Sequence, residues 1–152
     1  MITTTKQLCT FRLDDHLFGV DAQSVQEVIR YQEMTQVPLT SSAVCGLINL
    51  RGQIVTAIDV RRRLGMADRA SDRLPMNVVV RSEDGAVSLL VDQIGDVIEV
   101  DADLFELPPD TLRGSARSYV QGAYKLESQL LLLLDTEQVV QVSENEHPLA
   151  DR

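Results

Sequence analysis

Residues 46–59 read GLINLRGQIVTAID, and residues 122–135 read GAYKLESQLLLLLD. The two stretches align without a gap. The same Gly, Leu, Gln and Asp stand at their ends and middle, and apolar positions match between them. A repeat spaced by half of the 152-residue chain is typical of two copies of one small unit. The sequence therefore predicts two related lobes.

The first copy has the pattern of a hairpin followed by a helix. Two apolar runs, at 47–50 and 53–58, are joined by Arg51-Gly52. This spacing favours a tight turn in which the glycine supplies any positive φ. Asp59 is then expected to cap a short helix over 60–64. The second copy repeats the order of strand, turn, strand, capping Asp and helix.

Alternating or continuous apolar runs predict further strands along the chain. We also expect a short helical turn between Asp21 and Ile29 and a surface loop over 66–75. The predicted strands cover 8–13, 17–20, 47–50, 53–58, 77–81, 86–91, 97–100, 120–126 and 129–134.

Many short strands with turn signals and only short helices are typical of small antiparallel barrels. The sequence therefore predicts a mostly β fold with two such barrels, packed side by side or intertwined. They would form a single domain over 7–142, with lobes of roughly 7–70 and 76–142. Residues 143–152 would be a polar tail.

The chain is acidic, with a formal net charge of −9. We expect no nucleic-acid partner, because phosphate binding needs clustered basic side chains. Residues 1–75 hold nine basic and eight acidic residues, whereas residues 76–152 hold five and fifteen. Such asymmetry would allow weak head-to-tail self-association, although an acidic surface that serves only solubility is the simpler interpretation.

The sequence shows no arrangement of residues that would support catalysis. His16 falls in a predicted turn and His147 in the tail, and neither has a Cys or Ser partner at a recognisable spacing. Cys9 and Cys45 make neither a disulfide framework nor a metal site. No apolar run approaches the length of a membrane span, and no signal segment opens the chain. We therefore expect a cytoplasmic, non-enzymatic protein without metal, cofactor or direct membrane insertion.

Arginines are the candidates for partner binding. Arg51 stands where the second copy has Glu127. It is either a solvent-facing turn residue or a fixed donor for a partner's carboxylate or carbonyl groups. Arg61, Arg62 and Arg63 form the basic run of the chain. They either favour the C-terminal end of a short helix or dock a partner.

Residues 46–61, GLINLRGQIVTAIDVR, closely resemble the G-v-i-n-L-R-G-x-i-v-P-v-i-D-L-R signature of CheW-like domains. Similar stretches upstream, at 18–28, and downstream, at 90–97, extend the resemblance over about 7–142. One departure is Thr56, where the family usually has proline. The family consists of bacterial chemotaxis coupling proteins, and this chain is similar to the stand-alone form. The resemblance implies two SH3-like five-stranded antiparallel barrels with short helices.

The resemblance also implies an adaptor function. Such an adaptor links the cytoplasmic hairpin tips of methyl-accepting chemoreceptors to the regulatory domain of the histidine kinase CheA, at receptor arrays near the inner membrane. Kinase contacts would be apolar residues near the barrel ends. A groove between the barrels would accept the receptor's helical hairpin. The positions that match the family's receptor contacts are Val25, Glu27, Arg51, Ser88 and Val97.

Two other functions stay open at this point. A CheW-like adaptor of a non-flagellar chemosensory-like pathway, such as pilus motility, would share all of these features. A small-molecule-binding or hydrolytic domain would instead have a deep polar pocket with convergent carboxylates.

Overall fold

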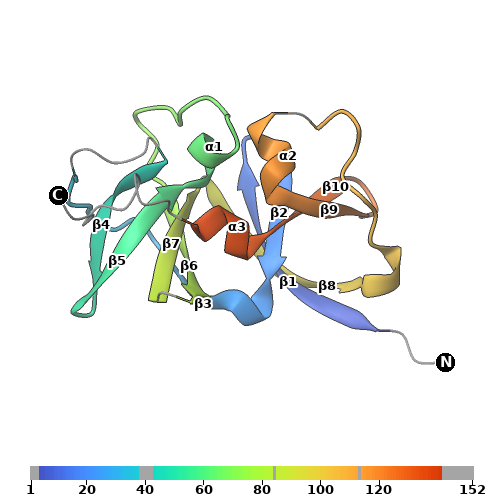
Figure 1. Ribbon diagram of the computed structural model, residues 1–152, viewed down its shortest axis with the longest axis horizontal. Coiled ribbons are helices and arrows are strands. Elements are labelled where there is room, and N and C mark those ends of the chain that lie inside the picture. Colours follow the sequence, from blue (N-terminus) through green and yellow to red (C-terminus); the bar gives the residue numbers. More distant parts are fainter. Residues whose placement is uncertain (1–3, 38–42, 84, 113, 142–152) are drawn as a thin grey trace.

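The computed structural model of the protein describes residues 4–37, 43–83, 85–112 and 114–141. Two sheets lie side by side, and short helices lie at their junction (Figure 1). The predicted tail and His147 lie outside the described residues. The elements are β1 (Thr5–Leu13), β2 (His16–Asp21), the 3₁₀ turn η1 (Ala22–Ser24), β3 (Val25–Ile29), β4 (Val44–Leu50), β5 (Gln53–Asp59), α1 (Val60–Arg63), β6 (Met76–Ser82), β7 (Gly85–Val91), β8 (Gln93–Asp101), η2 (Ala102–Leu104), α2 (Ser115–Tyr119), β9 (Val120–Lys125), β10 (Leu130–Leu134) and α3 (Thr136–Val140).

The two sheets share one topology. Sheet A has the strand order β8-β1-β2-β10-β9, and sheet B has the order β3-β6-β7-β5-β4. Each contains two antiparallel hairpins joined by a central parallel pair, β2 with β10 in sheet A and β7 with β5 in sheet B. The repeat in the sequence is therefore a repeat in the structure.

The lobes do not follow the two halves of the chain, which corrects the predicted division at 7–70 and 76–142. Sheet A combines the first hairpin of the first half with three strands of the second half, and sheet B does the reverse. The chain crosses between the sheets after β2 and again after β7, so each half completes the sheet of the other. Sheet B is thus one continuous segment, β3 to β7, inserted between the two parts of sheet A.

The predicted mostly β fold of two five-stranded units with short helices is confirmed, except that the sheets are not closed antiparallel barrels. Each sheet has one parallel pair, and the strand order of each is open among the described residues. Each sheet nevertheless curls around its own small core. That of sheet A includes Leu8, Tyr124 and Leu131, and that of sheet B includes Ile48 and Val55.

A larger apolar core lies between the sheets and holds them together. Phe11 and Phe18 of sheet A stack with ring centroids 6.0 Å apart, and they belong to the same buried cluster as Val78 and Leu89 of sheet B. Burial of this shared cluster supplies the main attraction between the sheets. None of the helices in the described part of the chain is long and apolar enough to cross a membrane.

The glycines that open the two repeat copies share one structural reason. Gly46 and Gly122 lie where another segment crosses the outer strand of each sheet, with bridges from Thr35 to Leu47 and from Glu106 to Ala123. A Cβ at Gly46 would lie 2.5 Å from the Thr35 carbonyl oxygen, and one at Gly122 would lie 2.4 Å from that of Glu106. Only glycine permits this close approach.

Local signals predicted the second half of each copy correctly. The Asp59 side chain accepts a hydrogen bond from the Arg61 amide, as a helix cap does, and Asp135 caps α3 in the same way. The segment after Asp21 differs from the expectation. Asp21 caps only the three-residue turn η1, and the chain then extends as β3, because pairing with β6 takes up its backbone groups.

Candidate partner-binding surface

The turn between β4 and β5 presents Arg51 in a fixed orientation. Arg51 and Gly52 have φ values of 53° and 88°, as a type I′ hairpin turn requires. The Asn49 side chain accepts a hydrogen bond from the Gly52 amide at 2.8 Å. The Arg51 guanidinium donates two hydrogen bonds to the Glu27 carboxylate, at 2.6 and 2.8 Å. This bidentate geometry is the strong and well-oriented form of an arginine–carboxylate pair.

The Glu27–Arg51 pair joins the two edges of sheet B. Glu27 lies on β3, at one end of the strand order, and Arg51 directly follows β4, at the other end. This ion pair therefore connects the two edges of the curled sheet, in addition to the backbone bridge between Thr35 and Leu47. The matching turn position of sheet A is Glu127, which has no hydrogen to donate to a carboxylate.

The pair is accessible, with 72% of the Arg51 side chain and 18% of the Glu27 side chain exposed. The hydrogen bond from Arg51 lowers the pKa of Glu27, so both groups are charged at neutral pH. Two N–H groups of the predicted donor at Arg51 thus already bind Glu27 within the chain. A partner at this surface would meet an oriented ion pair.

The apolar contact residues predicted from the resemblance lie on edge strands. Val25 begins β3, two residues before Glu27, and is half-buried against the shared core. Val97 lies in the middle of β8, the edge strand of sheet A, and is 59% exposed. The structure therefore brings Val25, Glu27 and Arg51 together on sheet B and places Val97 on the other sheet.

Ser88 is not available for contact. It is fully buried on β7, and its hydroxyl donates a 2.7 Å hydrogen bond to the Asn77 side-chain oxygen. The Asn77 amide in turn donates to the backbone carbonyl of Arg30, at the end of β3, at 2.9 Å. Ser88 thus helps to fix the strand that carries Glu27, and its predicted direct contact is wrong for the side chain.

The basic run on α1 is largely internal, which contradicts a docking role for two of its three members. Arg61 and Arg63 are buried, and Arg63 donates to the backbone carbonyls of Val139 and Gln141 beside α3. Arg62 is the accessible one, with 38% of its side chain exposed and a 3.1 Å ion pair to Asp68. Arg61 and Arg63 point into the protein because their partners, Asp92 and the carbonyls beside α3, lie on two different sides of this short helix. Arg62, between them, points to the surface.

Arg61 belongs to a buried network that sequence reasoning missed. Asp92 accepts hydrogen bonds from Arg61 at 2.8 and 2.5 Å, from Arg69 at 2.9 Å and from the Asp14 amide at 2.8 Å. Arg61 also donates to the Asp14 carboxylate at 2.6 Å, and Arg69 lies 3.4 Å from Asp59. The one signal in the sequence was Asp92 itself, within the downstream stretch that resembles the family.

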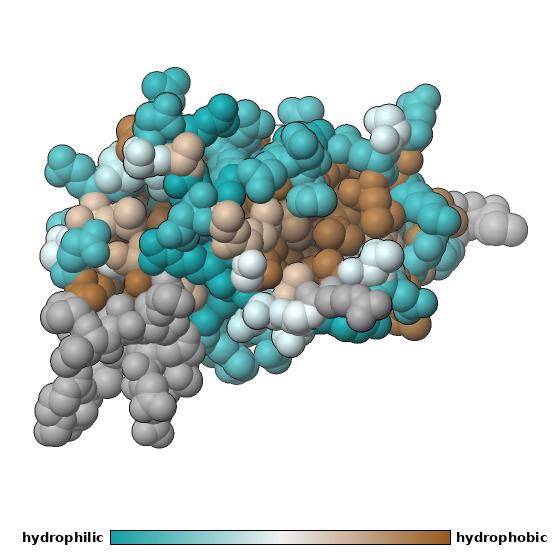
Figure 2. Space-filling view, turned by 90° about the horizontal axis from the view of Figure 1, so that it is seen from above, coloured by the Kyte–Doolittle hydropathy of each residue, from teal (hydrophilic) through white to brown (hydrophobic). Residues whose placement is uncertain are grey.

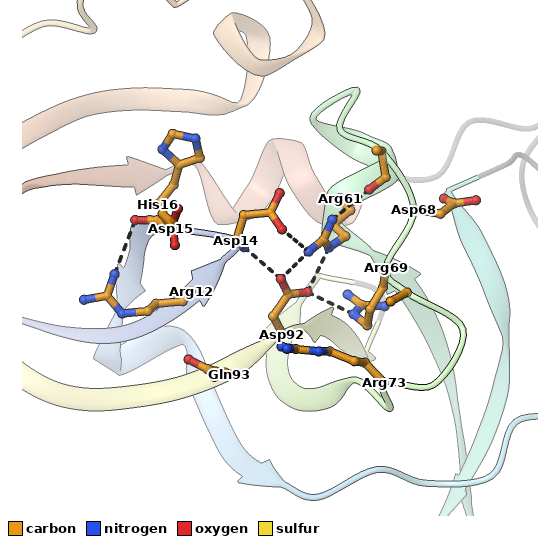
Figure 3. A pocket seen from close by; sticks show the side chains of 12 residues that line it. Arg12, Asp14, Asp15, His16, Arg61, Asp68, Arg69, Arg73, Asp92 and Gln93 are labelled. Carbon is orange, nitrogen blue, oxygen red and sulfur yellow. Dashed lines mark hydrogen bonds and ion pairs between the residues drawn. The ribbon is translucent and has the colours of Figure 1, made fainter.

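The network lines a cleft of about 990 Å³. Figure 3 shows the side chains around this cleft. Arg12 and His16 line the opposite side, and Arg73 lies below Asp92. The residues that line the cleft include none of the five predicted contact residues. Among the described residues, no group of three or more His, Cys, Asp or Glu side chains could hold a metal ion.

The lowered pKa of the Asp92 carboxylate predicts how the unfolding free energy of the protein depends on pH. Burial alone would raise its pKa, but the hydrogen bonds from Arg61, the Asp14 amide and Arg69 outweigh burial and lower the pKa to about 2. Because the folded-state pKa is below the unfolded value, the stabilisation is complete above about pH 4 and is lost as the pH falls towards 2. The contribution is about 2 kcal/mol.

Urea unfolding between pH 2 and 6 measures this effect. The unfolding free energy of Asp92→Asn should lack this component, so the difference from the parent protein should shrink as the pH falls from 4 to 2. A difference that does not vary with pH would contradict the assignment.

Apolar side chains are also exposed on sheet A. Figure 2 shows them gathered at the surface of the half of the molecule that contains this sheet. Among the exposed apolar residues, Leu104, Phe105 and Leu107 follow β8, and Leu107 is 79% exposed. Phe105 is anchored by edge contact with Tyr124 at a centroid distance of 5.6 Å. Exposed apolar patches of this kind are typical of protein–protein contact sites.

Comparison with known proteins agrees with this architecture. The family model of the CheW-like domain matches residues 7–144. The chain is 28% identical to "Chemotaxis protein CheW" of Treponema pallidum, over 85% of this chain and 78% of that protein. It is 28% identical to "Chemotaxis protein CheW" of Rhizobium meliloti, over 93% of this chain and 91% of that protein.

A solved structure shows the same fold. The crystal structure of the scaffolding protein TtCheW from Thermoanaerobacter tengcongensis superposes with a TM-score of 0.82 at 27% identity, covering 97% of this chain and all of that one. The family model and these likenesses cover the two sheets and the turn that carries Arg51. The chain therefore belongs to the CheW-like family, whose members are non-enzymatic scaffold proteins of bacterial chemotaxis.

Proposed function

We propose that this protein couples the cytoplasmic hairpin tips of chemoreceptors to the regulatory domain of the histidine kinase CheA. The observation that carries the proposal is the accessible, oriented Glu27–Arg51 pair on the edge of sheet B, in a chain of the CheW-like family. An adaptor binds its partners through rigid surfaces and needs no catalytic group. The Glu27–Arg51 edge of sheet B and the exposed apolar residues of sheet A are two such surfaces.

The receptor would contact both sheets. Val25, Glu27 and Arg51 lie on sheet B, and Val97 on β8 adds an exposed apolar residue on sheet A. β8 packs beside β6, which pairs with β3, so the two edge strands approach the same region of the molecule. A helical hairpin would gain affinity from the valines and orientation from the ion pair.

Calorimetry with a receptor hairpin fragment and, separately, with the CheA regulatory domain tests the function directly. Binding to both partners, and a change in CheA autophosphorylation only when all three components are present, is the expected result. Failure to bind either partner would end the proposal.

The kinase surface is expected at the exposed apolar residues after β8. Leu107→Asp places a charge where Leu107 would be buried by a partner, so affinity for the CheA regulatory domain should fall about tenfold or more, with receptor binding unchanged. Leu74→Asp is the matched control, because Leu74 is 63% exposed on the loop between α1 and β6. Equal losses in the two variants would remove Leu107 from the interface.

A further inference from the structure

Asp92 lies where the chain crosses from one sheet to the other. It follows β7, the last strand that the second half gives to sheet B, and precedes β8, the edge strand of sheet A. Arg61 comes from α1, directly after β5 of sheet B, and Asp14 comes from the β1–β2 turn of sheet A. The hydrogen bonds among these three residues therefore connect the two sheets at their crossover (Figure 3).

The geometry of the network restricts direction as well as distance. Both oxygens of Asp92 accept two hydrogen bonds each, Oδ1 from Arg61 and Arg69 and Oδ2 from Arg61 and the Asp14 amide. Asp14, which donates this amide, is itself a turn residue with a φ of 54°. A planar guanidinium and a carboxylate joined by two hydrogen bonds permit one relative orientation, whereas apolar packing alone permits sliding.

We propose that Asp92 and Arg61 are positioning residues that fix the start of β8 relative to sheet B. They thereby keep Val97 on sheet A at a constant distance and angle from the Glu27–Arg51 pair on sheet B. The inference rests on the proposed function, since it concerns how one receptor hairpin can contact both sheets at once. Binding sites on two bodies work together only when their separation is held to within about 0.5 Å.

Asp92→Asn tests the proposal with little change in volume. It keeps a polar side chain but removes the charge and turns one acceptor into a donor, which must face Arg61 or Arg69. Asp72→Asn is the matched control, because Asp72 is exposed on the loop between α1 and β6 and the change in net charge is the same.

Two measurements are needed on each variant. The first is the distance distribution between spin labels at Gln53 on sheet B and Gln121 on sheet A, by pulsed electron resonance, after Cys9→Ala and Cys45→Ala remove the native thiols. The second is the affinity for the receptor hairpin fragment. In Asp92→Asn the distribution should broaden, and the affinity should fall about five- to tenfold. Asp72→Asn should change neither.

The outcomes separate this inference from the proposed function. A narrow distance distribution in Asp92→Asn overturns the inference, and so does a broad distribution with unchanged receptor affinity. If the parent protein does not bind the receptor fragment at all, the proposed function fails, while the label distances still decide whether Asp92 fixes the sheets. If Asp92→Asn does not fold, Arg69→Gln removes one of the four donors to Asp92 and is judged by the same two results.

Discussion

Replacing Arg51 with glutamate is expected to reduce receptor affinity by about thirtyfold, which corresponds to about 2 kcal/mol, while the protein stays folded. The substitution removes the two hydrogen bonds to Glu27 and sets two carboxylates against each other at the edge of sheet B. The edges that the pair joins would then separate locally. Because the Arg51 side chain is mostly exposed, loss of the pair costs little folding free energy.

Calorimetry with the receptor hairpin fragment measures the affinity, and urea unfolding measures the stability. Arg73→Glu is the control, because it makes the same change in charge on the loop between α1 and β6. An Arg51→Glu variant that unfolds would show that the arginine serves the fold. Unchanged affinity in a folded variant would remove Arg51 from the receptor surface.

The charge-reversed double variant, Glu27→Arg with Arg51→Glu, distinguishes two ways in which the pair could act. If the pair serves only to close sheet B, the reversed pair restores receptor affinity. If the receptor also binds the charged groups directly, the unfolding free energy recovers in the double variant but the receptor affinity does not. The exposed guanidinium favours the second result, because a partner would contact it directly.

The parts of the fold that sequence reasoning predicted well depend on neighbouring residues. The turn at Arg51-Gly52 and the cap at Asp59 are set by turn chemistry and capping within a few positions, and both formed, although Arg51 as well as the glycine has a positive φ. The exchange of hairpins between the sheets is not a local property. The apolar patterns of the two halves are alike, so β1 and β2 could complete either sheet, and the pattern does not say which.

The candidate site shows the same limit. A resemblance to a family shows which position matches a contact residue, but it does not show whether that position is exposed in this chain. Ser88 was therefore predicted as a contact although it is fully buried. Likewise, a run of three arginines looks alike in sequence whether it faces water or the interior. Only the positions of Asp92 and of the Val139 carbonyl show that Arg61 and Arg63 point inward.

Arg61→Ala is expected to have the largest effect on stability, a loss of about 3 kcal/mol or more in the free energy of unfolding. The substitution leaves Asp92 with fewer donors and deprives Asp14 of its partner, and it opens a space in the contact between the sheets. The Ala67 carbonyl also loses a 2.8 Å hydrogen bond. For a domain of this size, whose total stability is about 5–15 kcal/mol, that is a large fraction.

Arg62→Ala provides the control within the same helix. Its side chain is partly exposed and its ion pair to Asp68 lies at the surface, so its removal should cost less than about 1 kcal/mol. Urea unfolding of both variants at neutral pH makes the comparison, since the two substitutions change net charge and helix propensity equally. Equal losses would mean that the buried pairing of Arg61 adds nothing beyond what a surface arginine adds. A loss confined to Arg61 would instead show that the hydrogen bonds among Arg61, Asp92 and Asp14, as well as the shared apolar core, stabilise the arrangement of the two sheets.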